Sequence, residues 1–183
     1  MSVVLAPIVE GHGEVDAVPV LLRRMAPELI VRRPVRFPRN RLVQEEHLRR
    51  AARIASANIE REGAILMLID SDEDCAARLG PDLEKRLSEF APNLTCRVVL
   101  AVREFEAWIV GGDPANAIDD PDRAGNLIGR LREQHGVYKK TADQPRLIAR
   151  SDLEILARRS RSYRHLEKVV REIQSLGRAG IGQ

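Results

Sequence analysis

Two carboxylates and two glycines follow the first apolar run of the chain, in the segment Val9-Glu10-Gly11-His12-Gly13-Glu14. A glycine-flanked turn that opens a helix often binds phosphate, but Glu10 and Glu14 would repel a bare phosphate group. The turn is therefore either an ordinary connection or one side of a cation site. His12 either positions a water or contacts phosphate there, or it is only a polar residue of a tight turn.

A second group of carboxylates, Asp70 and Asp72, follows the apolar run at residues 64–69. The aspartates are two positions apart, so an extended backbone would project both side chains in one direction. If the first and third strands are neighbours in a parallel sheet, Glu10 meets this pair at the carboxyl edge. Carboxylates held that close favour a hard cation, Mg²⁺ or Mn²⁺, and no His/Cys set is spaced for zinc. The alternative is that Asp72 or Asp74 only caps the following turn.

Two further glutamates, Glu104 and Glu106, follow the fourth apolar run and reach the same edge if that run is also a strand. Either one would add a metal ligand and, together with Glu14, hold a second ion. The choice between one ion and two stays open. Phe105 and Trp108 are spaced to share a helix face and are interpreted as core residues.

Arginines are concentrated in two runs of the sequence. A run of like charge is usually a solvated face. Near an acidic metal site, arginines also suit contact with the phosphate backbone of DNA or RNA, which needs positive charge but no base-specific code. The first run contains Arg32, Arg33, Arg36, Arg39 and Arg41, and the second contains Arg158, Arg159, Arg161 and Arg164.

The elements that carry these residues alternate between strands and helices. Strands are expected at residues 3–9, 31–37, 64–69 and 96–102, with helical periodicity between them. This order predicts an α/β fold with a four-stranded, mainly parallel sheet and helices on both faces.

Only helices are expected beyond the fourth strand, so the chain is predicted to end in a helical extension. They are placed at residues 104–110, about 122–134, and a last one through 166–176, with 138–144 as a polar stretch between helices. The expected organisation is an α/β core at residues 1–110, a helical extension packed on it at 111–176 and a loose tail at 177–183.

The whole composition is that of one globular domain of 183 residues, long enough to bury a core. A net charge of +3 permits a polyanionic partner without requiring one. Cys75 and Cys96 match no metal-ligand spacing, and neither a leader nor an apolar run of about 20 residues is recognisable. We therefore expect a cytoplasmic protein without membrane contact.

Glu10 after the first expected strand, with Asp70 and Asp72 after the third, resembles the signature of the TOPRIM fold. Topoisomerases, bacterial primases and nucleases of the overcoming-lysogenization-defect family share this fold. Glu10, Asp70 and Asp72 match the TOPRIM metal-binding acids, and Glu14 matches the second acid of the first loop. No topoisomerase tyrosine domain, primase zinc module or ATPase motif is recognisable. More closely, a family of small bacterial TOPRIM-like proteins is similar over most of the chain, through VEGHGEVDAVPVLLRR, LIDSDEDC, REFEAW and YKKTADQP.

The resemblance implies a Rossmann-like TOPRIM core and a divalent-metal-dependent nuclease that hydrolyses DNA or RNA, with Glu10, Glu14, Asp70 and Asp72 as its catalytic acids. It also implies a subunit of phage defence that works with a partner ATPase encoded by a neighbouring gene. Lys139 and Lys140 become candidates for stabilising charge on a scissile phosphate, although a solvated loop fits that stretch as well. The alternative function is a non-catalytic module that binds nucleic acid or a partner ATPase and uses the metal structurally.

Overall fold

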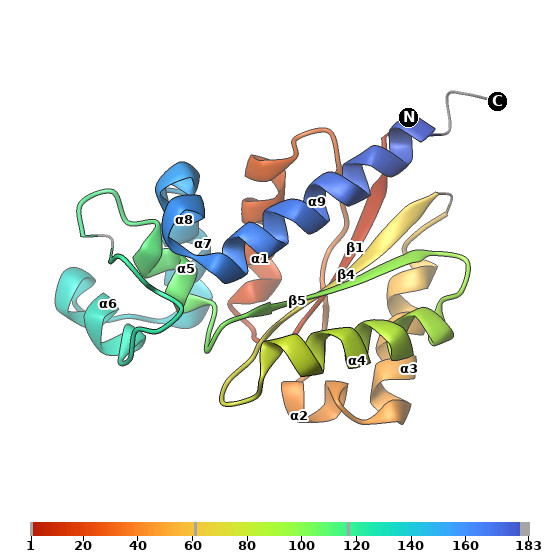
Figure 1. Ribbon diagram of the computed structural model, residues 1–183, viewed down its shortest axis with the longest axis horizontal. Coiled ribbons are helices and arrows are strands. Elements are labelled where there is room, and N and C mark those ends of the chain that lie inside the picture. The colour runs from red at the N-terminus through yellow and green to blue at the C-terminus, as the bar shows by residue number, and fades with distance from the viewer. Residues whose placement is uncertain (1, 61, 117, 180–183) are drawn as a thin grey trace.

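A parallel sheet forms the centre of the protein, whose computed structural model describes residues 2–60, 62–116 and 118–179 (Figure 1). The strand order is β2-β1-β4-β5, with β3 also paired to β1, and every pairing is parallel. The expected α/β class with a mainly parallel sheet is therefore confirmed. The strands are β1 (Val4–Val9), β2 (Ile30–Val31), β3 (Val35–Arg36), β4 (Gly63–Asp70) and β5 (Thr95–Ala101).

The expected single strand at residues 31–37 is wrong, because the chain forms two short strands there. Both pair with β1, as Ile30 lies opposite Val4 and Val35 lies opposite Ile8. Pro34 stands between them and has no N–H group to donate to a strand ladder. The sheet consequently has five strands rather than four.

Helices cover both faces of the sheet, as the alternating pattern predicts. One apolar cluster joins the strands to α1 and α9, and a second joins their other face to α3 and α4 (Figure 1). All eight residues of β4 are buried, as expected for a central parallel strand covered on both sides. The helices of this core are α1 (Glu14–Met25), α2 (Arg39–Leu42), α3 (Glu45–Ala57), α4 (Ala76–Phe90) and α9 (Arg161–Ala179).

The chain between β5 and α9 is helical, but its helices differ from those expected. The helix placed at 122–134 starts only at Leu127, because the Asp122 carboxylate instead accepts hydrogen bonds from Ser160 and Ser162 at the start of α9. The expected polar stretch at 138–144 lies largely in a helix that begins at Lys140. The helices are α5 (Glu106–Gly111), α6 (Leu127–His135), α7 (Lys140–Ile148) and α8 (Leu153–Arg159).

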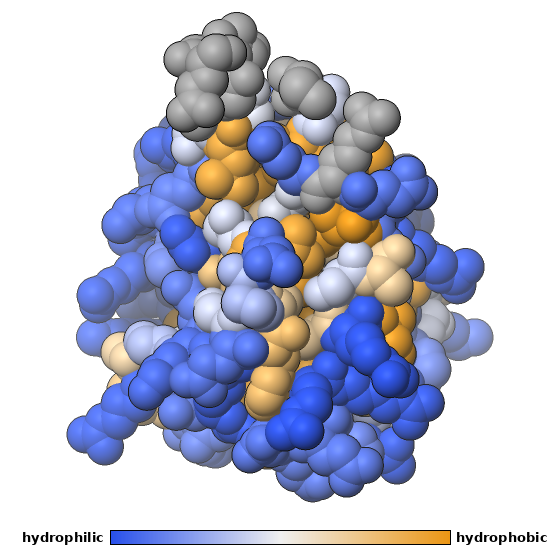
Figure 2. All heavy atoms as spheres, turned by 90° about the vertical axis from the view of Figure 1, so that its right-hand side faces the viewer, coloured by the Kyte–Doolittle hydropathy of each residue, from blue (hydrophilic) through white to orange (hydrophobic). Residues whose placement is uncertain are grey.

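The last helix extends further than the sequence pattern indicates. Residues 177–179, expected in the loose tail, belong to α9, and residues 180–183 lie outside the described part of the chain. Figure 2 shows a face on which hydrophilic residues surround hydrophobic ones that are exposed in patches between them. Among the described residues, no helix combines the length and the apolar character needed to cross a membrane.

Candidate metal centre

Three carboxylates converge at the carboxyl edge of the sheet. Glu10 follows β1, Glu14 opens α1, and Asp70 ends the neighbouring strand β4. One oxygen from each side chain lies within 4.8 Å of the others. The convergence follows from the register, because β1 and β4 pair in parallel and end side by side. Together these residues form a buried acidic cluster that can hold a metal ion.

The turn between Glu10 and Glu14 is folded around a carboxylate and not around a phosphate. Oε2 of Glu14 accepts hydrogen bonds from the backbone N–H groups of Gly11, at 3.1 Å, and Glu10, at 3.3 Å. A Cβ atom on Gly11 would stand only 2.6 Å from Oε1 of Glu14, so a larger residue would push this carboxylate away. Glycine is needed at position 11 because the Glu14 side chain packs against the turn, and the amides of Glu10 and Gly11 are bonded to that carboxylate.

Burial and mutual repulsion make these acids hard to ionise without a cation. Burial, with the charges of Glu14 and Asp72 adding to it, raises the pKa of Glu10 from 4.5 to about 7. Burial also raises the pKa of Glu14, and it raises that of Asp70 well above its usual range, with Glu14 and Glu10 contributing. Oε2 of Glu10 is buried without a hydrogen-bond partner in the described residues. An unpaired oxygen among repelling carboxylates fits a hard divalent cation such as Mg²⁺ or Mn²⁺.

Asp72 lies near this cluster but is not part of it. Its backbone is left-handed, with φ of 48°, so the expected extended arrangement of Asp70 and Asp72 is wrong. The Asp72 N–H donates to the Arg103 carbonyl oxygen at 3.0 Å. Arg39 donates to the carbonyl oxygens of Asp70, at 3.0 Å, and Ser71, at 3.2 Å. The same guanidinium lies 3.4 Å from the Asp72 carboxylate and pairs with Asp74. Asp72 therefore contributes charge to the centre, whereas its side chain faces an arginine.

A second layer of side chains surrounds Glu106 behind the cluster. The Glu106 side chain is fully buried and accepts hydrogen bonds from Tyr138, at 3.0 Å, and from Gln144, at 3.1 Å. The ammonium of Lys140 lies 3.1 Å from Glu106 and 3.8 Å from Glu104. Burial is the largest single influence on Lys140 and opposes its charged form, but the charge and hydrogen bond of Glu106, together with the charges of Asp70 and Glu104, outweigh it and raise the pKa of the lysine.

The start of α7 brings Lys140 to the centre. The Asp143 carboxylate accepts a hydrogen bond from the backbone N–H of Lys139, at 2.7 Å, and this fixes the first turn of the helix. Gln144 is buried against the glycine turn, where a Cβ on Gly13 would lie 2.6 Å from the Lys140 carbonyl oxygen. Lys140 therefore lies in a helix and pairs with Glu106, so the solvated-loop alternative fails for it although 43% of its side chain is exposed. Lys139 is also exposed. Reasoning from the sequence did not assign Tyr138 and Gln144 to the site. The signal that marks the start of this helix is the position of Asp143, four residues after Lys139.

Two of the five arginines of the first run, Arg32 and Arg39, form hydrogen bonds within the fold. Arg39 ties the Asp70 loop in place, and Nε of Arg32 donates to the Asn58 carbonyl oxygen at 3.1 Å. Nε of Arg36 is buried without a hydrogen-bond partner among the described residues. Arg33 and Arg41 remain exposed, as does His12 in the glycine turn.

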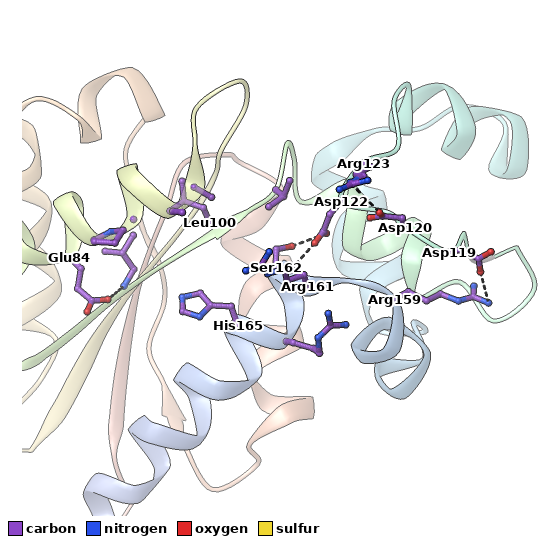
Figure 3. Close-up of a pocket in the computed structure, with 17 residues that line it drawn as sticks. Glu84, Leu100, Asp119, Asp120, Asp122, Arg123, Arg159, Arg161, Ser162 and His165 are labelled. Carbon is purple, nitrogen blue, oxygen red and sulfur yellow. Dashed lines mark hydrogen bonds and ion pairs between the residues drawn. The ribbon is translucent and has the colours of Figure 1, made fainter.

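The second run lies at the junction of α8 and α9 and borders a cavity of about 840 Å³ (Figure 3). Arg159, Arg161 and Arg164 line this cavity, whereas Arg158 is exposed and does not. Arg159 lies 3.7 Å from Asp119, and Arg164 donates to the carbonyl oxygen of Ala157 at 2.9 Å. The strand residues of the lining are apolar and come from β5 and its end: Val98, Leu100 and Val102.

Fold and site together define an α/β protein with a buried acidic cluster at the carboxyl edge of a parallel sheet. Comparison of the chain with protein-family models, curated proteins and solved structures gives no match. The TOPRIM resemblance and the function it implies therefore stay proposals that depend on the residues themselves.

Proposed function

We propose that this protein is a divalent-metal-dependent phosphodiesterase of TOPRIM type that hydrolyses DNA or RNA. The observation that carries the proposal is the buried cluster of Glu10, Glu14 and Asp70, whose oxygens approach within 4.8 Å of one another. Structural carboxylates of that kind are normally paired with cationic side chains, yet Oε2 of Glu10 has no partner in the described chain. A bound Mg²⁺ or Mn²⁺ would satisfy this oxygen.

The residues of the chain have distinct roles in this proposal. Glu10, Glu14 and Asp70 hold the ion, which when bound polarises the phosphodiester and activates a water. Lys140 provides a fixed positive charge for the phosphoryl oxygens of the transition state. Arg161 and Arg164, on the cavity wall, contact the phosphate backbone beyond the reacting group.

A partner ATPase encoded by a neighbouring gene, and with it a role in phage defence, belongs to the same proposal. The sequence has no nucleotide-binding motif of its own that would couple cleavage to ATP hydrolysis. The ATPase would have to be supplied by a second protein chain.

One observation favours the second candidate function, a non-catalytic module that binds nucleic acid or a partner ATPase. Asp72 matches a TOPRIM metal-binding acid, but its carboxylate lies 3.4 Å from Arg39 and its side chain is 58% exposed. A centre that lacks this ligand would hold the ion to stabilise the fold.

A cleavage assay separates the two functions. Purified protein is incubated with supercoiled DNA, single-stranded DNA and RNA, with Mg²⁺, Mn²⁺ or EDTA, alone and with its neighbouring ATPase. We expect metal-dependent cleavage by the wild type and none by Asp70→Asn, which keeps an oxygen for the 2.8 Å hydrogen bond from the Phe105 N–H but removes the charge. Ion binding without cleavage of any substrate would favour the non-catalytic module, and no ion binding would contradict both functions.

A further inference from the structure

The ammonium of Lys140 occupies the position that a second metal ion would need. Its nitrogen lies 3.1 Å and 3.3 Å from the two oxygens of Glu106 and 3.8 Å from Glu104. These two glutamates are the residues that a second ion would use beside Glu14. A divalent ion that bound both of them would have to displace the lysine.

The lysine is held in this position by the fold. It begins α7, whose first turn is closed by Asp143 and whose Gln144 donates to the same Glu106 carboxylate at 3.1 Å. The helix cannot move toward the sheet, because its backbone already touches Gly13. The ammonium is thus held in the carboxylate network by its contacts with Glu106, although 43% of the Lys140 side chain is exposed.

The charges around the centre agree with one ion and one lysine. The charge of Glu106 acts on both Glu14 and Asp70, so the two layers of acids lie within electrostatic reach of each other. The charge of Lys140 is also coupled to Asp70. In two-metal phosphodiesterases the cations stand about 4 Å apart and stabilise opposite sides of the reacting phosphate. A lysine beside a single ion supplies the positive charge that the second ion would otherwise supply. Unlike an ion, the lysine is covalently part of the chain and cannot dissociate from the site.

We propose that this centre binds one divalent ion, through Glu10, Glu14 and Asp70, and that the Lys140 ammonium replaces the second ion. The inference rests on the proposed metal-dependent function, and it deepens that function by fixing the number of ions. It predicts a property that can be measured without any substrate, namely the count of ions bound per chain.

The test measures Mn²⁺ binding by titration, with free Mn²⁺ followed by its electron paramagnetic resonance signal. We expect one ion per wild-type chain. Lys140→Met keeps an unbranched side chain that is one atom shorter but removes the charge beside Glu104 and Glu106, so it should bind two ions, whose magnetic coupling broadens the spectrum. Lys140→Arg keeps the charge and should bind one ion. The neighbouring control Lys139→Met, changed at an exposed residue, should also bind one.

Each outcome of this titration decides the inference. Two ions on the wild type, or one ion on a folded Lys140→Met variant, would overturn it. If Lys140→Met does not fold, Lys140→Gln takes its place, since it removes the charge but can still donate a hydrogen bond to Glu106; it should bind two ions, and one ion on it would overturn the inference. No ion on the wild type would overturn both this inference and the proposed function. One ion without nuclease activity would overturn only the proposed function.

Discussion

The metal-free protein should lose stability as the pH rises from about 5 to 8, because carboxylates are then forced to ionise inside the cluster. Burial raises the pKa of Glu10 from 4.5 in its ordinary state to about 7 in the folded protein. A carboxyl with a higher pKa in the folded than in the unfolded chain contributes stability below its unfolded pKa. That stability is lost as the pH rises through the folded pKa.

The size of the loss follows from the Glu10 pKa. A rise from 4.5 to about 7 corresponds to at most about 3 kcal/mol of folding free energy at full ionisation. Part of the Glu10 side chain is solvent-accessible, so screening reduces this to about 2 kcal/mol. For a chain of 183 residues we expect Tm to fall by about 4–8 °C. The pKa values of Glu14 and Asp70 are also raised by burial, so the ionisation of these two residues adds to the loss of stability.

Calorimetric melts at pH 5 and pH 8 measure this loss, first in EDTA and then in Mg²⁺. The ion should remove most of it, because it binds the ionised carboxylates of the folded state only. The matched control is Glu10→Gln, which does not titrate and should show a smaller fall in Tm in EDTA. A wild type whose Tm changes with pH equally in EDTA and Mg²⁺, and equally with Glu10→Gln, would contradict a cation site at this cluster.

Two further predictions concern the cavity and the glycine turn. Charge reversal at Arg161 and Arg164 should weaken the binding of a fluorescent oligonucleotide at least tenfold and reduce its salt dependence, whereas reversal at the exposed Arg49 on α3 should leave both unchanged. If reversal at Arg49 weakened binding as much as reversal at Arg161 and Arg164, the binding would depend on the net charge of the protein and not on the cavity. Gly13→Ala should destabilise the protein by about 1–3 kcal/mol in urea unfolding, because its Cβ would stand 2.6 Å from a backbone oxygen of α7. Gly125→Ala, with nothing within 4 Å of its Cβ, should be neutral, and a neutral Gly13→Ala would show that α7 is not packed on the turn.

Local sequence pattern predicts the parts of this protein that depend on strand direction. Parallel strands end at one edge, so residues that follow two neighbouring strands must approach each other. The approach of Glu10 and Asp70 is a direct result. The class of the fold was predictable for a similar reason, because apolar runs alternating with helical periodicity leave few arrangements other than a parallel sheet.

Features set by distant contacts were not predictable from spacing. The left-handed backbone of Asp72 accompanies its contact with Arg39, a residue 33 positions earlier, and alternation along the chain carries no sign of this pair. The same holds for Lys140, which reaches the centre only because α7 packs on the turn at Gly13. The split of β2 from β3 is different, since Pro34 marks it in the sequence, and the alternation of arginines with apolar residues on both sides of it led to the prediction of one strand.

The hydrogen bonds that the Glu14 carboxylate accepts from the turn make ion occupancy visible in the backbone. An ion that draws electron density from this carboxylate weakens its bond to the Gly11 amide, at 3.1 Å. The Gly11 amide proton should therefore shift in a nitrogen-edited NMR spectrum when the ion binds. Because this amide belongs to a glycine, whose ¹⁵N resonance falls in a sparsely populated region of the spectrum, a single peak would report the loading of the centre during titration or turnover.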